Sequence, residues 1–251
     1  MSVTNNYKKN FLKNVIFRLD YSIILDLSEN KPINFQKEII DDFPILEPIT
    51  QLGFQLEQQG EEMSAKNLKK TIWKFLSKDK LKSIELDQEY LSISIKNNTY
   101  TTFGEYRELV EKIITLFYNN YPSTIINRLG LRYINEIQIN ESDNFEWSNY
   151  LDDSLTGCFN FLEDKTKVKR VINSFITKVN DNSFLNFKYG IFNKHFPSEI
   201  VDKTFILDYD CYTREQLEKS DILPKIGLYN EVITEKFEKS IKKGLRDLLN
   251  N

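Results

Sequence analysis

Histidine, alanine and cysteine are nearly missing from this 251-residue sequence. It has one histidine (His195), one alanine (Ala65) and two cysteines, Cys158 and Cys211. One histidine excludes a histidine-rich metal site, and two distant cysteines form neither a C-x-x-C pair nor a disulfide framework. We therefore expect two free, buried thiols, as in proteins of a reducing compartment.

Glycine is also scarce, and its spacing is informative. The closest two of the eight glycines, Gly53 and Gly60, are seven positions apart. This spacing excludes every G-x-G, and with it the dinucleotide-binding fingerprint and the P-loop. The sequence also lacks the G-x-S-x-G elbow of many hydrolases and the H-E-x-x-H zinc motif.

Long hydrophobic runs are absent. The best one, 15–27, is interrupted by Arg18, Asp20 and Asp26, and residues 1–14 are polar. We therefore expect no signal peptide and no membrane-spanning helix, and we expect a cytoplasmic protein. The net charge of −3, with 28% charged residues of mixed sign, gives no overall field toward nucleic acid or acidic membranes.

Aromatic residues are plentiful. Eighteen Phe and thirteen Tyr against a single Ala favour a sheet over a helical bundle. The spacing of apolar residues predicts strands at 12–27, 46–57, 72–76, 83–96, 127–139, 159–162, 168–179, 184–192 and 205–212. It predicts helices at 35–43, 102–120 and 227–249, a short one near 147–151, and exposed loops at 58–70 and 140–153.

The strand at 127–139 is the most distinctive stretch. One face carries Leu129, Leu131, Tyr133, Ile137 and Ile139, and the other Arg128, Gly130, Arg132, Glu136 and Gln138. Ile134 and Asn135 break this alternation, and a bulge near them would restore it. Gly130 between two arginines predicts a close approach to the backbone. Either a packed side chain crosses a core strand there, or the two arginines form an anion cradle.

The predicted elements form two similar halves. Each offers several antiparallel strands followed by one long amphipathic helix, while residue identities differ. We therefore expect an α+β fold with a largely antiparallel sheet and two long amphipathic helices, built as a diverged internal duplication. Because no Pro-, Gly- or Ser-rich linker separates them, halves of approximately 11–140 and 154–251 should form one compact domain over 1–251.

A short basic run is the main candidate binding site. Its members are Lys165, Lys167, Lys169 and Arg170, joined by Arg128 and Arg132 if their strands are neighbours. Such a patch can bind the phosphates of single-stranded nucleic acid. Lysines on an edge strand also prevent edge-to-edge aggregation, so both interpretations stay open.

Carboxylates supply the only other candidate chemistry. Asp208 and Asp210 share one strand face, which suits a divalent metal, although no third carboxylate lies nearby in sequence. Ion pairs on a solvated sheet are the competing interpretation. His195 follows a strand in a turn, and we expect a surface histidine rather than a base for either cysteine. No cofactor is predicted.

The octet R-L-G-L-R-Y-I-N at 128–135 resembles the hallmark strand of an uncharacterised, sporadically distributed prokaryotic family of about 250 residues, written R-x-G-L-R-Y-x-N. The opening strand, the Asp42-Phe43-Pro44 element and the closing helix follow the same order. The resemblance implies no activity, cofactor or catalytic residue. It implies a patchy distribution, typical of accessory genes such as anti-phage defence loci and toxin–antitoxin pairs.

These observations favour a non-enzymatic protein-interaction component of such a system, with a protein partner encoded by a neighbouring gene. Two alternatives stay open. One is single-stranded nucleic-acid binding through the basic run, which the net negative charge and the acidic segment before the run disfavour. The other is a metal-dependent enzyme using a carboxylate site.

Overall fold

The computed structural model describes residues 7–59, 62–97, 99–139, 143 and 145–251. One nine-stranded antiparallel sheet organises these residues, in the order β2-β3-β4-β5-β1-β6-β9-β8-β7. The expected α+β class and antiparallel sheet are confirmed. The strands are β1 (Leu12–Tyr21), β2 (Ile45–Gln59), β3 (Glu62–Leu76), β4 (Lys82–Leu86), β5 (Tyr90–Lys96), β6 (Ile126–Gln138), β7 (Val171–Lys178), β8 (Ser183–Ile191) and β9 (Thr204–Thr213).

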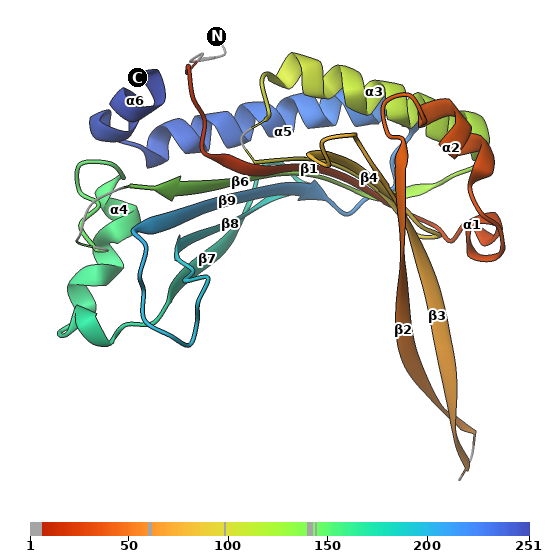
Figure 1. Cartoon of the computed structure of the whole chain (residues 1–251), viewed down its shortest axis with the longest axis horizontal. Helices are drawn as coiled ribbons and strands as arrows, with labels where there is room; N and C mark the ends of the chain where they lie inside the picture. The colour runs from red at the N-terminus through yellow and green to blue at the C-terminus, as the bar shows by residue number, and fades with distance from the viewer. Residues whose placement is uncertain (1–6, 60–61, 98, 140–142, 144) are drawn as a thin grey trace.

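The two long helices lie over one face of the sheet (Figure 1). They are α3 (Phe103–Asn120) and α5 (Lys219–Ser240). The shorter helices are α1 (Leu25–Glu29), α2 (Ile33–Ile39), α4 (Asp153–Thr156) and α6 (Lys243–Asn250), with 3-10 turns η1 (Gly157–Phe161) and η2 (Lys165–Lys167). Among the described residues, no helix is long and apolar enough to cross a membrane.

The sheet order shows the relation between the two halves. Read outward from the central pair, β1-β5-β4-β3 on one side matches β6-β9-β8-β7 on the other, and strand β2 lies outside this symmetry. In chain order, each half is one strand, then a meander, then a long helix. The meander is β2-β3-β4-β5 before α3 and β7-β8-β9 before α5. By this order, β6 groups with the strands that follow it, whereas the predicted halves placed 127–139 in the first one.

The core lies between the sheet and the two helices. Strand β1 contributes Val15, Phe17 and Leu19, all completely buried, and α3 and α5 cover them with their apolar stripes. Buried tyrosines retain hydrogen bonds: the Tyr106 hydroxyl donates to Ile93 O (2.7 Å), and that of Tyr209 to Ser240 Oγ (2.8 Å). These bonds offset the cost of burying a polar group.

Helix α3 begins as its sequence predicts. The Thr102 hydroxyl oxygen accepts a hydrogen bond from the Glu105 amide at 3.2 Å, which caps the first turn. The Glu105 side chain accepts a further bond from the Thr101 hydroxyl. The buried residues of α3 are Tyr106, Val110, Ile113, Ile114 and Phe117. They are five of the six apolar residues whose helical spacing predicted this helix, the sixth being Leu109.

Several predicted boundaries in the first half are wrong. The first strand ends at Tyr21, and α1 follows. The predicted strand 83–96 is two strands, because the Asp87 carboxylate accepts hydrogen bonds from the amides of Glu89 (2.6 Å) and Tyr90 (2.9 Å) and turns the chain. The predicted loop 58–70 belongs mostly to strand β3.

Several predicted elements in the second half are also wrong. The predicted strand 159–162 lies in η1 and the residue after it, and 147–151 forms hydrogen-bonded turns in place of a helix. Part of the predicted loop 140–153 (140–142 and 144) lies outside the described residues. The predicted helix 227–249 begins earlier, at Lys219, and is divided at Ile241–Lys242 into α5 and α6.

Strand β6 has no bulge at Ile134 and Asn135, because the extra residue opposite this pair lies in β1. Its register with β9 runs without a shift from Leu129↔Thr213 to Gln138↔Thr204. The register between β1 and β6 shifts twice, once between Leu12 and Asn14 of β1 and once where Asp20↔Arg128 is followed by Tyr21↔Ile126. Asn135 therefore remains on the helix-covered side, where it is buried.

Candidate functional site

The sheet face turned away from α3 and α5 carries most of the singled-out residues. Arg128, Gly130 and Arg132 alternate along β6 on this face, which we call the open face. Their neighbours across the sheet are Arg18 and Asp20 of β1 and Asp208 and Asp210 of β9. Because β6 lies between β1 and β9, these residues meet at the middle of the sheet.

Arg132 forms a two-pronged ion pair with Asp208. Its Nε donates to Asp208 Oδ1 at 2.7 Å and its Nη2 to Oδ2 at 2.6 Å. The Asp208 side chain is only 5% exposed, whereas that of Arg132 is 39% exposed. The hydrogen bonds to Asp208 raise the pKa of the Arg132 guanidinium, opposed by its partial burial. The pair is therefore a fixed part of the open face.

Arg128 crosses the strand over Gly130. Its Nη1 lies 3.3 Å from Asp20 Oδ2, its Nη2 3.7 Å from Asp210 Oδ2, and its guanidinium carbon 5.1 Å from the ring centre of Tyr212. A Cβ built on Gly130 would lie 3.1 Å from Arg128 Nη1. The predicted close approach is confirmed, and the approaching group is the Arg128 side chain. Both guanidinium groups already face carboxylates, so the arrangement matches the packed side chain rather than the anion cradle.

The aspartate pair on β9 is engaged in the same network. Burial raises the pKa of Asp210, opposed by Arg128 and Arg132. Of the two interpretations of Asp208 and Asp210, a metal site or ion pairs on the sheet, the geometry matches the ion pairs. Within the described part of the chain, no three His, Cys, Asp or Glu side chains group as metal ligands would.

Ion pairs extend across the first half of the open face. Arg18 Nε lies 2.6 Å from Asp20 Oδ1, and Lys74 Nζ 2.6 Å from Glu85 Oε1. The Arg18 guanidinium also stacks 4.0 Å from the ring centre of Tyr90. The open face therefore presents charges of both signs, held in place by their neighbours.

The basic run is not an extended strand. Lys165 and Lys167 lie in η2, and Lys167 Nζ is 3.1 Å from Asp164 Oδ2. Lys169 Nζ is 3.0 Å from Glu199 Oε1. Arg170 Nε donates to Phe192 O at 3.0 Å.

Arg128 and Arg132 do not join the basic run. Strands β9 and β8 separate β6 from β7, which follows the run. The six basic residues therefore form no single surface, and three of the four in the run already have partners.

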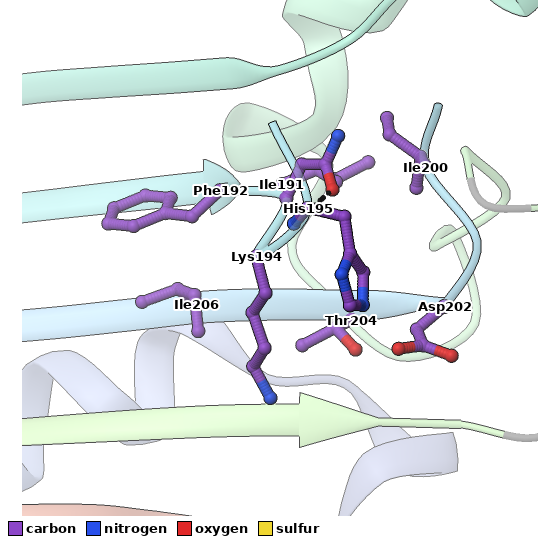
Figure 2. A pocket seen from close by; sticks show the side chains of 9 residues that line it. Ile191, Phe192, Lys194, His195, Ile200, Asp202, Thr204 and Ile206 are labelled. Atoms are coloured by element: carbon purple, nitrogen blue, oxygen red, sulfur yellow. Dashed lines mark hydrogen bonds between the residues drawn. The ribbon is translucent and has the colours of Figure 1, made fainter. Parts of the chain in front are cut away.

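His195 lies on the surface, as expected. It belongs to the turn after β8, beside a cavity of about 30 Å³ with Asp202 and Thr204 (Figure 2). This volume holds about one water molecule. Cys211 is buried, which raises its pKa to about 12, whereas Cys158 is exposed, contrary to the prediction. Neither cysteine lines this cavity.

Strands β2 and β3 form a long hairpin that the sequence did not reveal. They pair from Ile45↔Leu76 to Gln59↔Glu62, whereas β4 pairs with β3 only from Trp73 to Leu76. The outer part, which we call the arm (residues 50–59 and 62–71), thus has no third strand among those described. It extends away from the sheet (Figure 1), by roughly 30 Å at ~3.3 Å per residue.

The arm carries apolar side chains into solvent near its base. The Leu52 side chain is 76% exposed, and Ile49, which precedes the arm, is 40% exposed. The polar composition of 58–70 predicted a loop, because a two-stranded ribbon has no buried face to impose alternation. The predicted strands 46–57 and 72–76 cover most of β2 and only the base of β3.

Comparisons with known proteins do not extend these observations. The chain matches no model of a known protein family and no curated protein.

Proposed function

We propose that the protein is a non-enzymatic, cytoplasmic protein-interaction component of a prokaryotic accessory system, such as anti-phage defence or toxin–antitoxin pairing. The arm is the observation that carries this proposal. The resemblance of the octet at 128–135 supports the type of system. The partner is a protein, expected from a neighbouring gene.

The arm is suited to protein contact because it pairs with no third strand among those described. Two-stranded ribbons are marginally stable in water, and this one leaves Leu52 in solvent. A partner that covers Leu52 and Ile49 would bury apolar area that the chain itself leaves uncovered.

The open face complements the arm. Its ion pairs hold charges of both signs in fixed positions, and such patterns select partners and orient them more than they add affinity. The partner expected from this chemistry has an apolar surface that contacts the arm. It also has charged side chains opposite in sign to the arginines and aspartates that they face on the open face.

The test compares two leucines of similar exposure. Leu52 on the arm is 76% exposed, and Leu25 in α1 is 70% exposed. Tagged wild-type protein, Leu52→Asp and Leu25→Asp would be expressed in the native host, and the captured protein purified and titrated against each variant. We expect Leu52→Asp to weaken binding at least tenfold, since a charge then replaces the apolar contact. Equal binding by the two variants would exclude the arm as the contact.

Nucleic-acid binding remains an alternative that the geometry favours less. Lys167, Lys169 and Arg170 each have a partner, and a phosphate would have to compete with those contacts. We predict a dissociation constant no tighter than about micromolar for an unstructured RNA or DNA 20-mer at physiological salt. Fluorescence anisotropy checks this. Tight, salt-sensitive binding that is lost in Lys167→Glu/Lys169→Glu/Arg170→Glu would replace the protein-partner proposal.

A metal-dependent enzyme is the other alternative. Its aspartates, Asp208 and Asp210, face Arg132 and Arg128. Elemental analysis of the purified protein tests it, because a stoichiometric divalent metal that is lost in Asp208→Asn/Asp210→Asn would favour an enzyme.

A further inference from the structure

A cavity of about 490 Å³ opens on the helix-covered side of β6, away from the open face. Tyr133 and Asn135 of β6 line it from the sheet, and residues of α3, α5 and the segment before β1 complete it. Small-molecule sites in proteins are typically about 300–1,000 Å³ and mostly apolar, with a few fixed polar groups. This cavity has both features.

The polar groups at the sheet side are buried and ordered. Asn135 is 4% exposed, and its one hydrogen bond to a described residue is a long one, from Nδ2 to Leu207 O at 3.5 Å. The Tyr133 hydroxyl donates to Asn230 Oδ1 at 2.9 Å and lies 3.0 Å from the Tyr100 hydroxyl. Since Tyr133 donates to Asn230, Tyr100 donates to Tyr133. The Asn135 carboxamide and the Asn230 NH₂ group are therefore left with capacity to bind a ligand.

The first turn of α3 supplies further donors. Thr102 caps the Glu105 amide, whereas the amides of Phe103 and Gly104 have no partner among the described residues. First-turn amides point out of the N-terminal end of a helix, where the helix dipole favours an anion. Thr101, Thr102, Phe103 and Gly104 all line the cavity.

The remaining walls are apolar and largely uncharged. Phe103, Ile233 and Phe237 line the cavity from the two helices. Glu238 also lines it, but accepts a hydrogen bond from the Tyr7 hydroxyl at 2.8 Å and pairs with Arg246 Nε at 3.4 Å. Lys9 and Glu231 are exposed and of opposite charge.

Two glycines on the two helices leave the space open. A Cβ on Gly227 would meet nothing within 4 Å, and one on Gly104 would meet only Thr102 Oγ1, at 3.8 Å. Both residues line the cavity. Glycine destabilises a helix relative to alanine, and packing requires it at neither position. Glycine at these two positions keeps the cavity open, because a larger side chain at either one would occupy part of the cavity volume.

We propose that this cavity binds a small organic monoanion, with its carboxylate at the first turn of α3 and Asn135 and its ring-sized apolar body beside Phe103 and Phe237. The cavity is lined by both polar groups and apolar side chains, so the ligand is amphipathic. This site is independent of the arm and the open face.

The experiment uses three probes of one shape on the full chain. Isothermal titration would compare 2-naphthoate, 2-naphthamide and the cation 2-naphthylmethylamine. We expect 2-naphthoate to bind with a dissociation constant of about 0.01–1 mM, the amide about fivefold more weakly and the amine not measurably. No binding of 2-naphthoate, or equal binding of the amine, would overturn the proposal.

Variants place the binding in this cavity. Gly227→Leu and Gly104→Leu fill the space from either helix, and each should weaken 2-naphthoate at least about tenfold. Gly227→Ala is the matched control and should change affinity less than about threefold. Asn135→Leu should weaken the naphthoate more than the amide. Thermal melting confirms that each variant is folded. Unchanged affinity in whichever of the two leucine variants folds would place the probe elsewhere and overturn the proposal.

Discussion

At the scale of single residues, the two arginines of β6 have different environments although they lie two positions apart. Arg132 is held by both oxygens of one buried carboxylate, whereas Arg128 lies over a glycine between two carboxylates. Gly130 lies between Arg128 and Arg132 along β6, and it has no side chain that would displace the Arg128 guanidinium.

Gly130→Val should therefore destabilise the protein by about 1–3 kcal/mol, because the new side chain overlaps the Arg128 guanidinium and moves it away from Asp20 and Asp210. Urea denaturation measures the change. Gly157→Ala is the control, since a Cβ there meets nothing within 4 Å. An unchanged free energy of unfolding in Gly130→Val would show that the contact between Arg128 and Gly130 does not stabilise the fold.

Asp210 supplies a prediction about pH. Burial raises its pKa above the ordinary value of 3.8, so the folded state holds this proton more tightly than the unfolded state. The stabilisation from this proton is complete below pH 3.8 and is lost as pH rises through the folded-state pKa. Asp210→Asn does not ionise, so its melting temperature relative to wild type should increase from pH 4 to pH 7.

Asp164→Asn is the matched comparison. Hydrogen bonds from Thr166 and Lys167 lower the pKa of Asp164, so its ionised form is stabilising and the sign reverses. The stabilisation from this ionised carboxylate is present above pH 3.8 and is lost as pH falls through the folded-state pKa. The melting temperature of Asp164→Asn relative to wild type should therefore not rise from pH 4 to pH 7. A difference for Asp210→Asn that decreases with pH would contradict the assignment.

At the scale of elements, a tertiary contact interrupts the C-terminal helix. Ile241 bridges to Leu151, the Asp152 amide donates to Ser240 O at 2.9 Å, and the Lys242 amide donates to Tyr150 O at 2.8 Å. These bonds take the backbone at 241–242 out of the helical conformation. Helix α6 then begins against the same segment, where Gly244 N donates to Asn149 O at 3.1 Å.

Two helical glycines should therefore respond oppositely to alanine. A Cβ on Gly244 would lie 2.6 Å from Asn149 O, a backbone atom that cannot easily move. We expect Gly244→Ala to cost about 1–3 kcal/mol. Gly227→Ala meets nothing within 4 Å and should stabilise by up to about 1 kcal/mol. Chemical denaturation of both variants checks this, and a gain in both would show that the 149–151 contact does not constrain α6.

At the scale of the whole molecule, the sheet is symmetric about β1 and β6, and the arm is an addition to one edge. The symmetric part buries its apolar face under α3 and α5, whereas the arm pairs only with itself among the described strands. Global stability should therefore reside in the symmetric part.

Removing the arm should leave the fold intact. Replacing residues 52–69 with Asn-Gly joins the paired residues Gln51 and Lys70 by a two-residue hairpin turn. This variant keeps Lys70, whose Nζ lies 3.0 Å from Oδ2 of the buried Asp87. We expect the melting temperature to change by less than about 3 °C, since none of the core residues among those described is removed, while partner binding is lost. A cooperative loss of structure in calorimetry would show instead that the arm supports the sheet.

The sequence by itself determined the elements whose apolar residues repeat with a local period. Helix α3 with its Thr102 cap, the β7–β8 hairpin and the alternating faces of β6 all follow from residues a few positions apart. It also identified Gly130 as a site of close approach and Asn135 as an exception on an apolar face. Such features are local, so a short window contains their cause.

Only the tertiary structure decided the remaining features, because their causes lie far apart in the chain. Asp208 meets Arg132 across 76 residues, and Leu151 interrupts a helix 90 residues later at Ile241. Residues 62–70 form a strand because backbone pairing with β2 requires no apolar pattern. Asn135 stays on the helix side because β6 pairs with β9 in unbroken register, and packing of two helices above it, with glycines at 104 and 227, leaves the cavity that it lines.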